Sequence, residues 1–484
     1  MTLPTRLDTR SRTQLTAPTD VFSPVESRSF RFRLPRIVDY LWVIGLMTFI
    51  YAGMPLATFH ADEAMQIYTS GDFWTLFIDE NLRALETRPP YEIDSDAQLR
   101  LLNGSVNRYT IGLAWYLNDV SETNLPERPG WNWGISYDDN VRKGFRPAPE
   151  LLNLSRLPST IFLMLSIPIL WALGHRAGGR VGAYTATLLV ALNPAVLLNG
   201  RRALQEGSML FFGLYTIYLA AVISANRARG RASGITWLLL SLSAGLAVAS
   251  KHTGLVFVAG AAGWLVAAEL LRTTPRGVLR LFGLGQKVAW MLILAAGVFF
   301  ALTPALWSNR PFAQVNDLLT VRADLVTLQT ELFPETALPD EQARFDAIIT
   351  QPFSAPLMHY EAPSYGESAA VQQEIAAYME SPLSGLHWGE AGIFIVILTI
   401  SGAAVALLGL TSRNLLERDF SAGILVSLAV VIAYLTLNPL EWQRYYLPLI
   451  PLAALLSGSA LGFVFKAREQ KEVLTTADVV SQYS

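Results

Sequence analysis

Apolar and polar stretches alternate along the whole chain, and ten apolar stretches are long enough to be considered as membrane spans. A helix needs about 20 apolar residues to cross the hydrocarbon core of a bilayer. The predicted spans are 37–57, 157–174, 181–198, 204–224, 235–250, 253–271, 288–307, 389–410, 420–437 and 445–465. Only a few residues around Lys251 separate two of them, 235–250 and 253–271, so these two also fit a single broken span. The pattern predicts an all-α integral membrane protein.

Two polar stretches, at about 58–156 and 308–388, are much longer than ordinary connections. Loops of this length in a compact protein are usually functional. Within the first, residues 107–117 are apolar but too short to span, so we expect a helix at the membrane interface. The predicted organisation is a basic tail (1–36), a first span (37–57), a first long loop (58–156), a membrane bundle (157–307), a second long loop (308–388), the last spans (389–465) and a second tail (466–484).

Composition and charge narrow the class of protein further. Hydrophobic residues make up 52% of the chain and charged residues only 16%, against about a quarter charged in soluble proteins. Lysine and arginine gather in the first tail and in alternate short loops. The positive-inside rule therefore places both termini in the cytoplasm and both long loops outside the cell membrane. Cysteine is absent, which excludes disulfides, thiolate nucleophiles and cysteine-based metal sites.

Asp62 and Glu63 are adjacent carboxylates that follow the first predicted span, next to His60. On a helix, neighbouring side chains diverge, so the two acids are not expected to grip one ligand atom together. One of them can then face a cavity as a base while the other supports it. The simpler interpretation is that both stand in the first turn of a solvated helix, where the helix dipole favours acids.

Cationic side chains mark the turns on the same predicted outer side. Arg201 and Arg202 follow the third span, with Glu206 four residues beyond Arg202. Guanidinium groups fit phosphate oxygens well. A local Arg202–Glu206 pair at i,i+4 spacing is the structural alternative.

The later outer turns carry Lys251 with His252, and Arg444 with Tyr445. A lysine at such a turn binds phosphate or extends to the membrane surface, and tyrosine is common in the interfacial aromatic belt. The chain has no glycine-rich phosphate loop, HExxH or GxSxG motif. His60 and Asp62 alone make a poor metal site, so no cofactor is expected, although a divalent metal stays open.

Several short segments, taken in order, resemble the GT-C-fold glycosyltransferases that use lipid-linked sugars, especially the protein O-mannosyltransferase and aminoarabinose transferase group. Arg88-Pro89-Pro90 departs from that pattern, because these proteins often have His in place of Arg88. The segments are His60–Ala64 (HADEA), Arg88–Pro90 (RPP), Asn153–Thr160 (NLSRLPST), Arg202–Phe212, Ser250–Gly254 (SKHTG) and Arg444–Pro451 (RYYLPLIP). Residues 310–388 match no segment of that group.

The resemblance implies a GT-C-like bundle of about ten transmembrane helices with two long outer loops carrying interfacial helices. It also implies inverting transfer of a sugar from a polyprenyl-phosphate or polyprenyl-diphosphate carrier to a protein, lipid or glycan hydroxyl on the outer face. The bilayer is an expected partner and nucleic acid is not. The roles that follow are catalysis by Asp62 and Glu63, donor phosphate binding by Arg201, Arg202, Lys251, Arg444 and Tyr445, and support from His60, Glu206 and His252.

Two other functions stay open from the sequence. A transporter or flippase of lipid-linked sugars would place ionisable groups within its spans and use paired discontinuous helices. A non-catalytic assembly scaffold would use the two long loops for docking, and it would tolerate charge changes at Asp62 and Arg202.

Overall fold

The computed structural model describes residues 36–93, 95–121, 130–272, 277–308 and 310–482. Within these ranges the chain is built from helices, and its only β-structure is an isolated bridge between Ala337 and Leu440. The predicted all-α class is confirmed. Apart from Arg36, the predicted basic tail lies outside the described residues.

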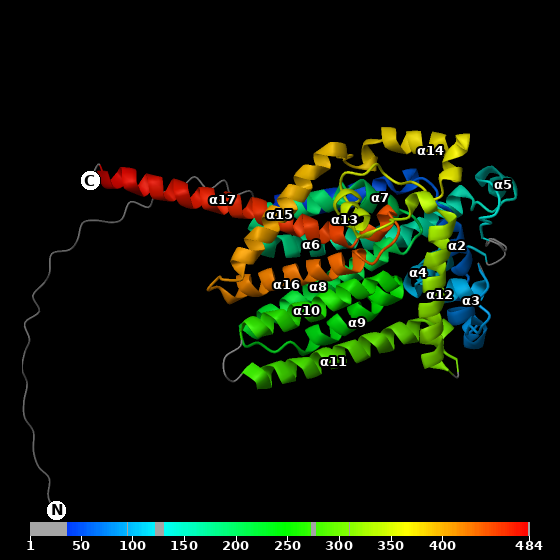
Figure 1. Cartoon of the computed structure of the whole chain (residues 1–484), viewed down its shortest axis with the longest axis horizontal. Helices are drawn as coiled ribbons and strands as arrows, with labels where there is room; N and C mark the ends of the chain where they lie inside the picture. Colours follow the sequence, from blue (N-terminus) through cyan, green and yellow to red (C-terminus); the bar gives the residue numbers. More distant parts are fainter. Residues whose placement is uncertain (1–35, 94, 122–129, 273–276, 309, 483–484) are drawn as a thin grey trace, which may run out of the picture.

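Long apolar helices lie side by side and form a bundle (Figure 1). Eight helical segments in the described ranges are long and apolar enough to cross a membrane, and Gly234–Ser250 is a shorter apolar helix beside them. The chain is a multi-pass membrane protein. The bundle helices are α1 (Arg36–Ala52), α6 (Pro149–Ala191), α8 (Glu206–Ala228), α9 (Gly234–Ser250), α10 (Leu255–Leu271), α11 (Gly277–Leu302), α15 (Gly392–Gly409), α16 (Leu415–Leu435) and α17 (Leu449–Gln482).

Helix α6 contains two of the predicted spans, 157–174 and most of 181–198. The chain reverses between them at Gly178 and Gly179, where the backbone is not helical. The two halves pack against each other, since the Trp171 and Tyr184 rings lie 4.8 Å apart and a Cβ on Gly174 would lie 2.9 Å from the Cα of Ala183. The turn expected between the two spans is therefore present. Gly179 has a φ of +67°, a conformation that glycine adopts without steric cost. The predicted end at residue 198 is wrong, because the helix ends at Ala191 and Asn193 caps a separate helix, α7 (Pro194–Arg201).

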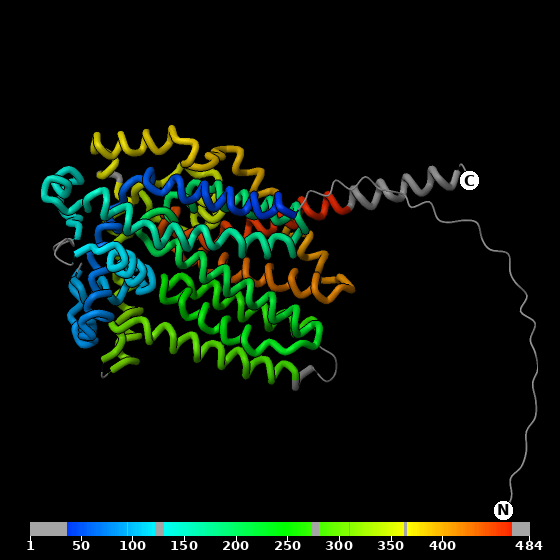
Figure 2. The backbone as a smooth tube through the Cα atoms, turned by 180° about the vertical axis from the view of Figure 1, so that it is seen from behind, coloured from blue at the N-terminus to red at the C-terminus, as the bar shows by residue number. Residues whose placement is uncertain are grey.

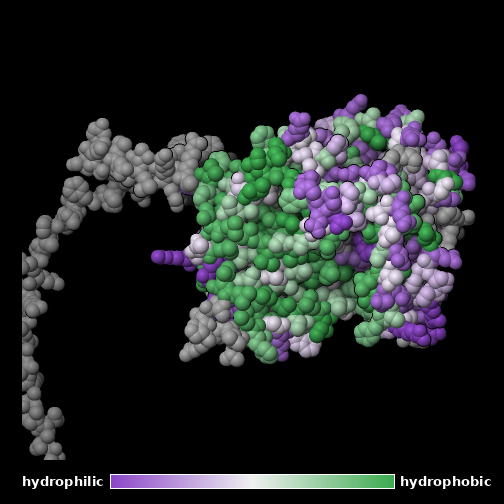
Figure 3. All heavy atoms as spheres, viewed as in Figure 1, coloured by the Kyte–Doolittle hydropathy of each residue, from purple (hydrophilic) through white to green (hydrophobic). Residues whose placement is uncertain are grey.

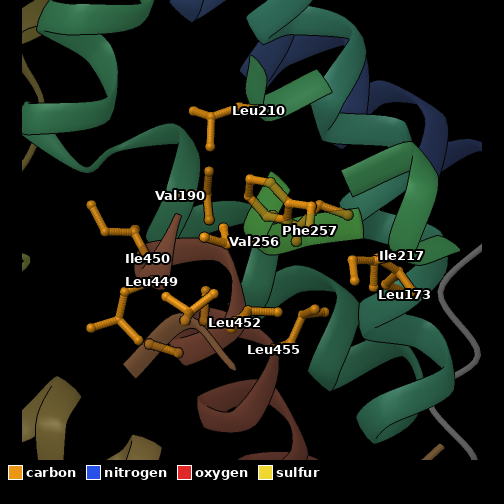
Figure 4. Packing of buried hydrophobic residues seen from close by; sticks show 14 of the residues in the cluster. Leu173, Val190, Leu210, Ile217, Val256, Phe257, Leu449, Ile450, Leu452 and Leu455 are labelled. Atoms are coloured by element: carbon orange, nitrogen blue, oxygen red, sulfur yellow. The ribbon is translucent and has the colours of Figure 1, made fainter. Parts of the chain in front are cut away.

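The core of the bundle forms where the start of α17 packs against α6 and α15. Figure 4 shows the leucine and isoleucine side chains of α17 facing Phe257 of α10 and Ile217 of α8. These side chains are almost wholly buried, and each fully buried aliphatic or aromatic side chain contributes roughly 1.5–3 kcal/mol. This packing fixes the chain immediately after Arg444 relative to the rest of the bundle.

Both long loops fold into helices at one end of the bundle, and all of these except α12 are short (Figures 1 and 2). Hydrophilic residues gather at that end, while apolar residues cover the bundle itself (Figure 3). The α4 helix confirms the helix expected near 107–117, whereas its interfacial position stays a prediction. The loop helices are α2 (Ala61–Thr69), α3 (Asp96–Leu102), α4 (Ser105–Tyr116), α5 (Tyr137–Arg142), α12 (Pro311–Leu332), α13 (Glu341–Thr350) and α14 (Ala369–Glu380).

Two close backbone contacts join the loops to the bundle turns. The second loop is held to the α16–α17 connection by hydrogen bonds from Leu338 N to Pro439 O (2.7 Å) and from Glu441 N to Thr336 O (3.0 Å). In the first loop, a Cβ on Gly104 would lie 1.9 Å from the carbonyl oxygen of Ser250, so only glycine fits there. The loops therefore converge on the turns that carry Lys251 and Arg444.

Candidate active site

A cavity of about 400 Å³ lies where the two long loops meet the polar end of the bundle. Its walls come from α2, α3, α12, the start of α8, the turn before α10, the loop after α13 and the loop before α17. Charged and aromatic groups share it with an aliphatic surface. The ionisable lining residues are His60, Asp62, Glu206, Lys251, Arg322, Tyr360, Glu361, Tyr365, Arg444 and Tyr445, and the apolar ones include Met65, Leu99, Leu102, Trp133, Leu325, Leu328, Leu332, Phe333 and Trp442.

In the first turn of α2, the side chains of Asp62 and Glu63 point in different directions, as expected for neighbouring residues on a helix. His60 caps this helix, since its ring Nδ1 accepts a hydrogen bond from the backbone N–H of Asp62 at 3.1 Å, and Glu63 bonds back to the backbone N–H of His60 at 3.0 Å. This is a reciprocal capping box. Asp62 then reaches the cavity with 31% of its side chain exposed, while Glu63 is wholly buried.

Glu63 anchors the loop to the bundle. Its two carboxylate oxygens accept hydrogen bonds from the Arg156 guanidinium, both at 2.8 Å, and one oxygen also accepts from the backbone N–H of Ala203 at 2.8 Å. Burial alone would raise the pKa of Glu63, but the charge of Arg156 brings the pKa below its ordinary value. Glu63 therefore supports the position of α2 and does not face the cavity.

Arg444 joins two carboxylates inside the cavity. Its guanidinium pairs with Asp62 and, through Nε, with Glu361 at 3.0 Å. Glu361 also accepts a hydrogen bond from His60 Nε2 at 2.5 Å. Because His60 Nδ1 is already an acceptor, Nε2 carries the ring proton in the neutral ring.

This network keeps both carboxylates ionised. Burial alone would raise the pKa of Asp62 and of Glu361, but Arg444 and His60 lower both pKa values. Burial alone would lower the pKa of Arg444, but the two acids raise it well above its ordinary value. Glu361 lies in the second long loop, and no sequence motif singled it out.

Lys251 and Glu206 form a second ion pair in the cavity, with the ammonium nitrogen 2.6 Å from the carboxylate. The same nitrogen lies 5.7 Å from the centre of the Tyr445 ring, within cation–π range. Tyr445 in turn stacks on Trp442, with ring centres 5.5 Å apart. The local Arg202–Glu206 pair considered from the sequence is not formed, since the chain between these residues is not helical and Glu206 pairs with Lys251.

Arg322 is a third cavity cation, contributed by α12. The side chain is partly exposed, and no carboxylate lies within ion-pair distance of it in the described part of the chain. The next turns of α12 place Leu325, Leu328 and Leu332 on the same wall. One side of the cavity thus combines an unpaired cation with an aliphatic stripe.

Besides Glu63, three of the predicted site residues lie outside the cavity lining. Arg201 is fully buried, and its guanidinium donates to the backbone oxygens of Ile50 (2.8 Å) and Phe49 (2.9 Å). Arg202 donates to Thr58 and to the backbone oxygen of His359. His252 contacts Phe299.

Arg201 and Arg202 thus bind the protein's own carbonyl oxygens. Two adjacent arginines at a helix end carry no sequence signal that distinguishes this structural role from phosphate binding.

No group of three or more His, Asp or Glu side chains in the described ranges is arranged to hold a metal ion. Asp62 and Glu361 converge, but the positive charge between them is the guanidinium of Arg444. What the cavity offers a ligand is therefore three carboxylates, three cations and an aliphatic wall.

Comparison with known proteins identifies the fold of the chain. Residues 137–316 match the family model for dolichyl-phosphate-mannose-protein mannosyltransferase. The oligosaccharyltransferase of Archaeoglobus fulgidus, solved in complex with Zn and sulfate, superimposes with a TM-score of 0.50 at 10% identity, over 91% of this chain and 51% of that one. The chain has the GT-C fold. The resemblance stated from the sequence is confirmed, as is the GT-C-like architecture.

Other GT-C structures show weaker similarity. ArnT from Cupriavidus metallidurans bound to undecaprenyl phosphate gives a TM-score of 0.37 at 14% identity, over 89% of this chain and 78% of that one. The Pmt1–Pmt2 O-mannosyltransferase complex of S. cerevisiae bound to the sugar donor gives 0.38 at 14% identity, over 57% and 35%. This GT-C chain spans about half the length of the oligosaccharyltransferase chains it matches. A comparison with curated proteins finds no match.

Proposed function

We propose that this chain is a membrane glycosyltransferase that moves a sugar from a polyprenyl-phosphate carrier to an acceptor hydroxyl. The observation that carries the proposal is a cavity that brings Asp62 together with three cations and an aliphatic wall. A lipid-linked sugar has the complementary parts, namely a polar sugar, an anionic phosphate and an apolar chain. The family match and the GT-C fold support the same class of reaction.

Asp62 acts as the general base in this proposal. Its carboxylate takes the proton of the acceptor hydroxyl while that oxygen forms a bond to the anomeric carbon of the sugar. The bond from the anomeric carbon to the phosphate oxygen breaks, and its electron pair leaves with the polyprenyl phosphate. Attack opposite the leaving phosphate inverts the configuration, and the proton passes from Asp62 to solvent.

The cavity cations stabilise the departing phosphate. Arg322, Lys251 and Arg444 come from three different segments and can surround an anion whose charge grows as the bond breaks. Leu325, Leu328 and Leu332 offer the first units of the carrier chain an apolar surface. Arg201, Arg202 and His252 have no contact with the donor in this scheme, while Tyr445 and Trp442 provide aromatic surface at its edge.

The proposed location of the reaction follows from the charge of the loops. Lysine and arginine gather in the first tail and in the short loops expected inside, so we place the termini in the cytoplasm and the site on the outer face of the cell membrane. Tagging each long loop for accessibility in intact cells tests this orientation.

The experiment that tests the activity uses purified protein and a panel of polyprenyl-phosphate sugars with protein, lipid and glycan acceptors. We expect free polyprenyl phosphate and glycosylated acceptor to form together, and we expect Asp62→Asn to abolish both. Asp79→Asn is the matched control, because Asp79 is exposed in the same loop and lies outside the cavity. Full activity of Asp62→Asn would reject this base. Lipid-linked sugar crossing vesicles without any transfer product would favour a flippase.

A further inference from the structure

The cavity is electrically balanced by the chain's own side chains. Its carboxylates are Asp62, Glu206 and Glu361, and its cations are Lys251, Arg322 and Arg444. Two of the cations are already paired with acids. An incoming phosphate adds negative charge to a partly buried site, where an uncompensated charge is costly. Arg322 compensates part of it, and a second cation must come from an existing ion pair.

Lys251 is the more costly cation to withdraw. Its partner Glu206 has only 3% of its side chain exposed. Removing Lys251 from it would leave a buried carboxylate without a cation, which is strongly unfavourable.

Arg444 is less costly to withdraw, because it has two acidic partners. If it leaves Asp62, it still holds Glu361, which is also bound to His60. Asp62 is the most exposed of these acids, at 31%, so water can solvate its carboxylate once the guanidinium moves. The exchange therefore releases one defined group, the carboxylate that the proposed function uses as its base.

We propose that Arg444 is a donor-operated lock on Asp62, in which the carrier's phosphate, met first by Arg322, draws the guanidinium off Asp62 and leaves it on Glu361. This inference rests on the proposed function, and it adds an order of events. Before the donor binds, Arg444 occupies the carboxylate that must accept the acceptor's proton. The base becomes available only when a sugar is in place to receive the acceptor.

The lock predicts a specific coupling between phosphate binding and the Asp62–Arg444 pair. The probe is undecaprenyl phosphate, titrated onto the full chain in detergent or nanodiscs. Asp62→Asn should tighten binding by roughly tenfold, because Arg444 no longer has to break an ion pair, and contacting charged residues couple by about this much. In an Arg444→Gln background the same change should have little effect on affinity.

A double-mutant cycle separates the lock from simple repulsion between carboxylate and phosphate. Repulsion would make Asp62→Asn tighten binding equally with and without Arg444, and that result overturns the lock. Glu206→Gln in a Lys251→Gln background provides a comparison that removes a carboxylate without freeing a cation and keeps Arg444 intact, and the lock requires its effect to be clearly smaller than that of Asp62→Asn. Equal effects would overturn the proposal even if Arg444→Gln did not fold. Failure of the wild-type chain to bind the probe at all would instead reject the proposed function.

Discussion

Glu63 and Arg156 are joined by a two-pronged ion pair that water does not reach, with both nitrogen–oxygen distances at 2.8 Å. Glu63→Gln should therefore destabilise the chain strongly, since breaking a buried pair costs about 3–5 kcal/mol. The measurement is thermal unfolding in detergent. Asp62→Asn is the control, because Asp62 is partly exposed and Arg444 keeps Glu361 as a partner. Similar stability losses in the two variants would contradict the division of roles between these adjacent acids.

Arg322 should contribute to donor binding and little to stability, because in the described ranges it has no carboxylate partner to lose. Arg322→Gln should weaken polyprenyl-phosphate binding by roughly 10- to 100-fold, the scale of one hydrogen bond to a charged group, at nearly unchanged melting temperature. Arg344→Gln provides the control, since Arg344 lies in the same loop on α13 and outside the cavity. Unaltered affinity in Arg322→Gln would remove this residue from the donor site.

The loss of activity at low pH should occur at different pH values in the profiles of kcat/KM and of kcat. Asp62 must be ionised to act, so activity falls as the pH drops through its pKa. In the free enzyme, burial raises the pKa of Asp62 and Arg444 lowers it, and the resulting pKa lies below its ordinary value. The pH dependence of kcat/KM for the donor reports this free-enzyme pKa. Once the phosphate has taken Arg444, the pKa rises, and we expect the kcat limb about one pH unit higher. Coincident limbs would argue against the lock.

His359 should make the chain less stable in mild acid. Burial and the nearby Arg202 lower its pKa to about 3, whereas the unfolded value is near 6.5. The unfolded state therefore binds more protons between these values, and the free energy of unfolding decreases as pH falls, by at most about 1.4 kcal/mol per pH unit. Melting temperatures at pH 7 and pH 5 measure this loss. His359→Gln should reduce the difference between them, and an unchanged difference would refute the assignment.

The sequence predicts the bundle far better than the completed site. Apolar runs of about 20 residues identify the spans, because the bilayer imposes that length, and the first-turn acids indicate where α2 begins. The ends of spans are less certain, since α6 ends at Ala191 where residue 198 was expected. Within the site, Asp62, Lys251 and Arg444 follow predicted spans closely enough for their convergence to be anticipated.

Glu361 and Arg322 could not be predicted in the same way. Both lie in the second long loop, whose path over the bundle depends on contacts distant in sequence, such as that between Leu338 and Pro439. Arg201 was predicted to bind phosphate and does not line the cavity. Its basic neighbour and its position at a turn favour phosphate binding. Its actual partners are backbone oxygens of α1, and no local pattern encodes such a contact.

The central claim is that a lipid-linked phosphate binds between Arg322 and Arg444 above the membrane bundle. A cryo-electron-microscopy structure of the full chain with undecaprenyl phosphate tests it most directly. We predict phosphate density in contact with both guanidinium groups, the lipid chain along the leucines of α12, and Asp62 separated from Arg444. Phosphate density outside this cavity, or a phosphate bound there while Arg444 still grips Asp62, would contradict the account.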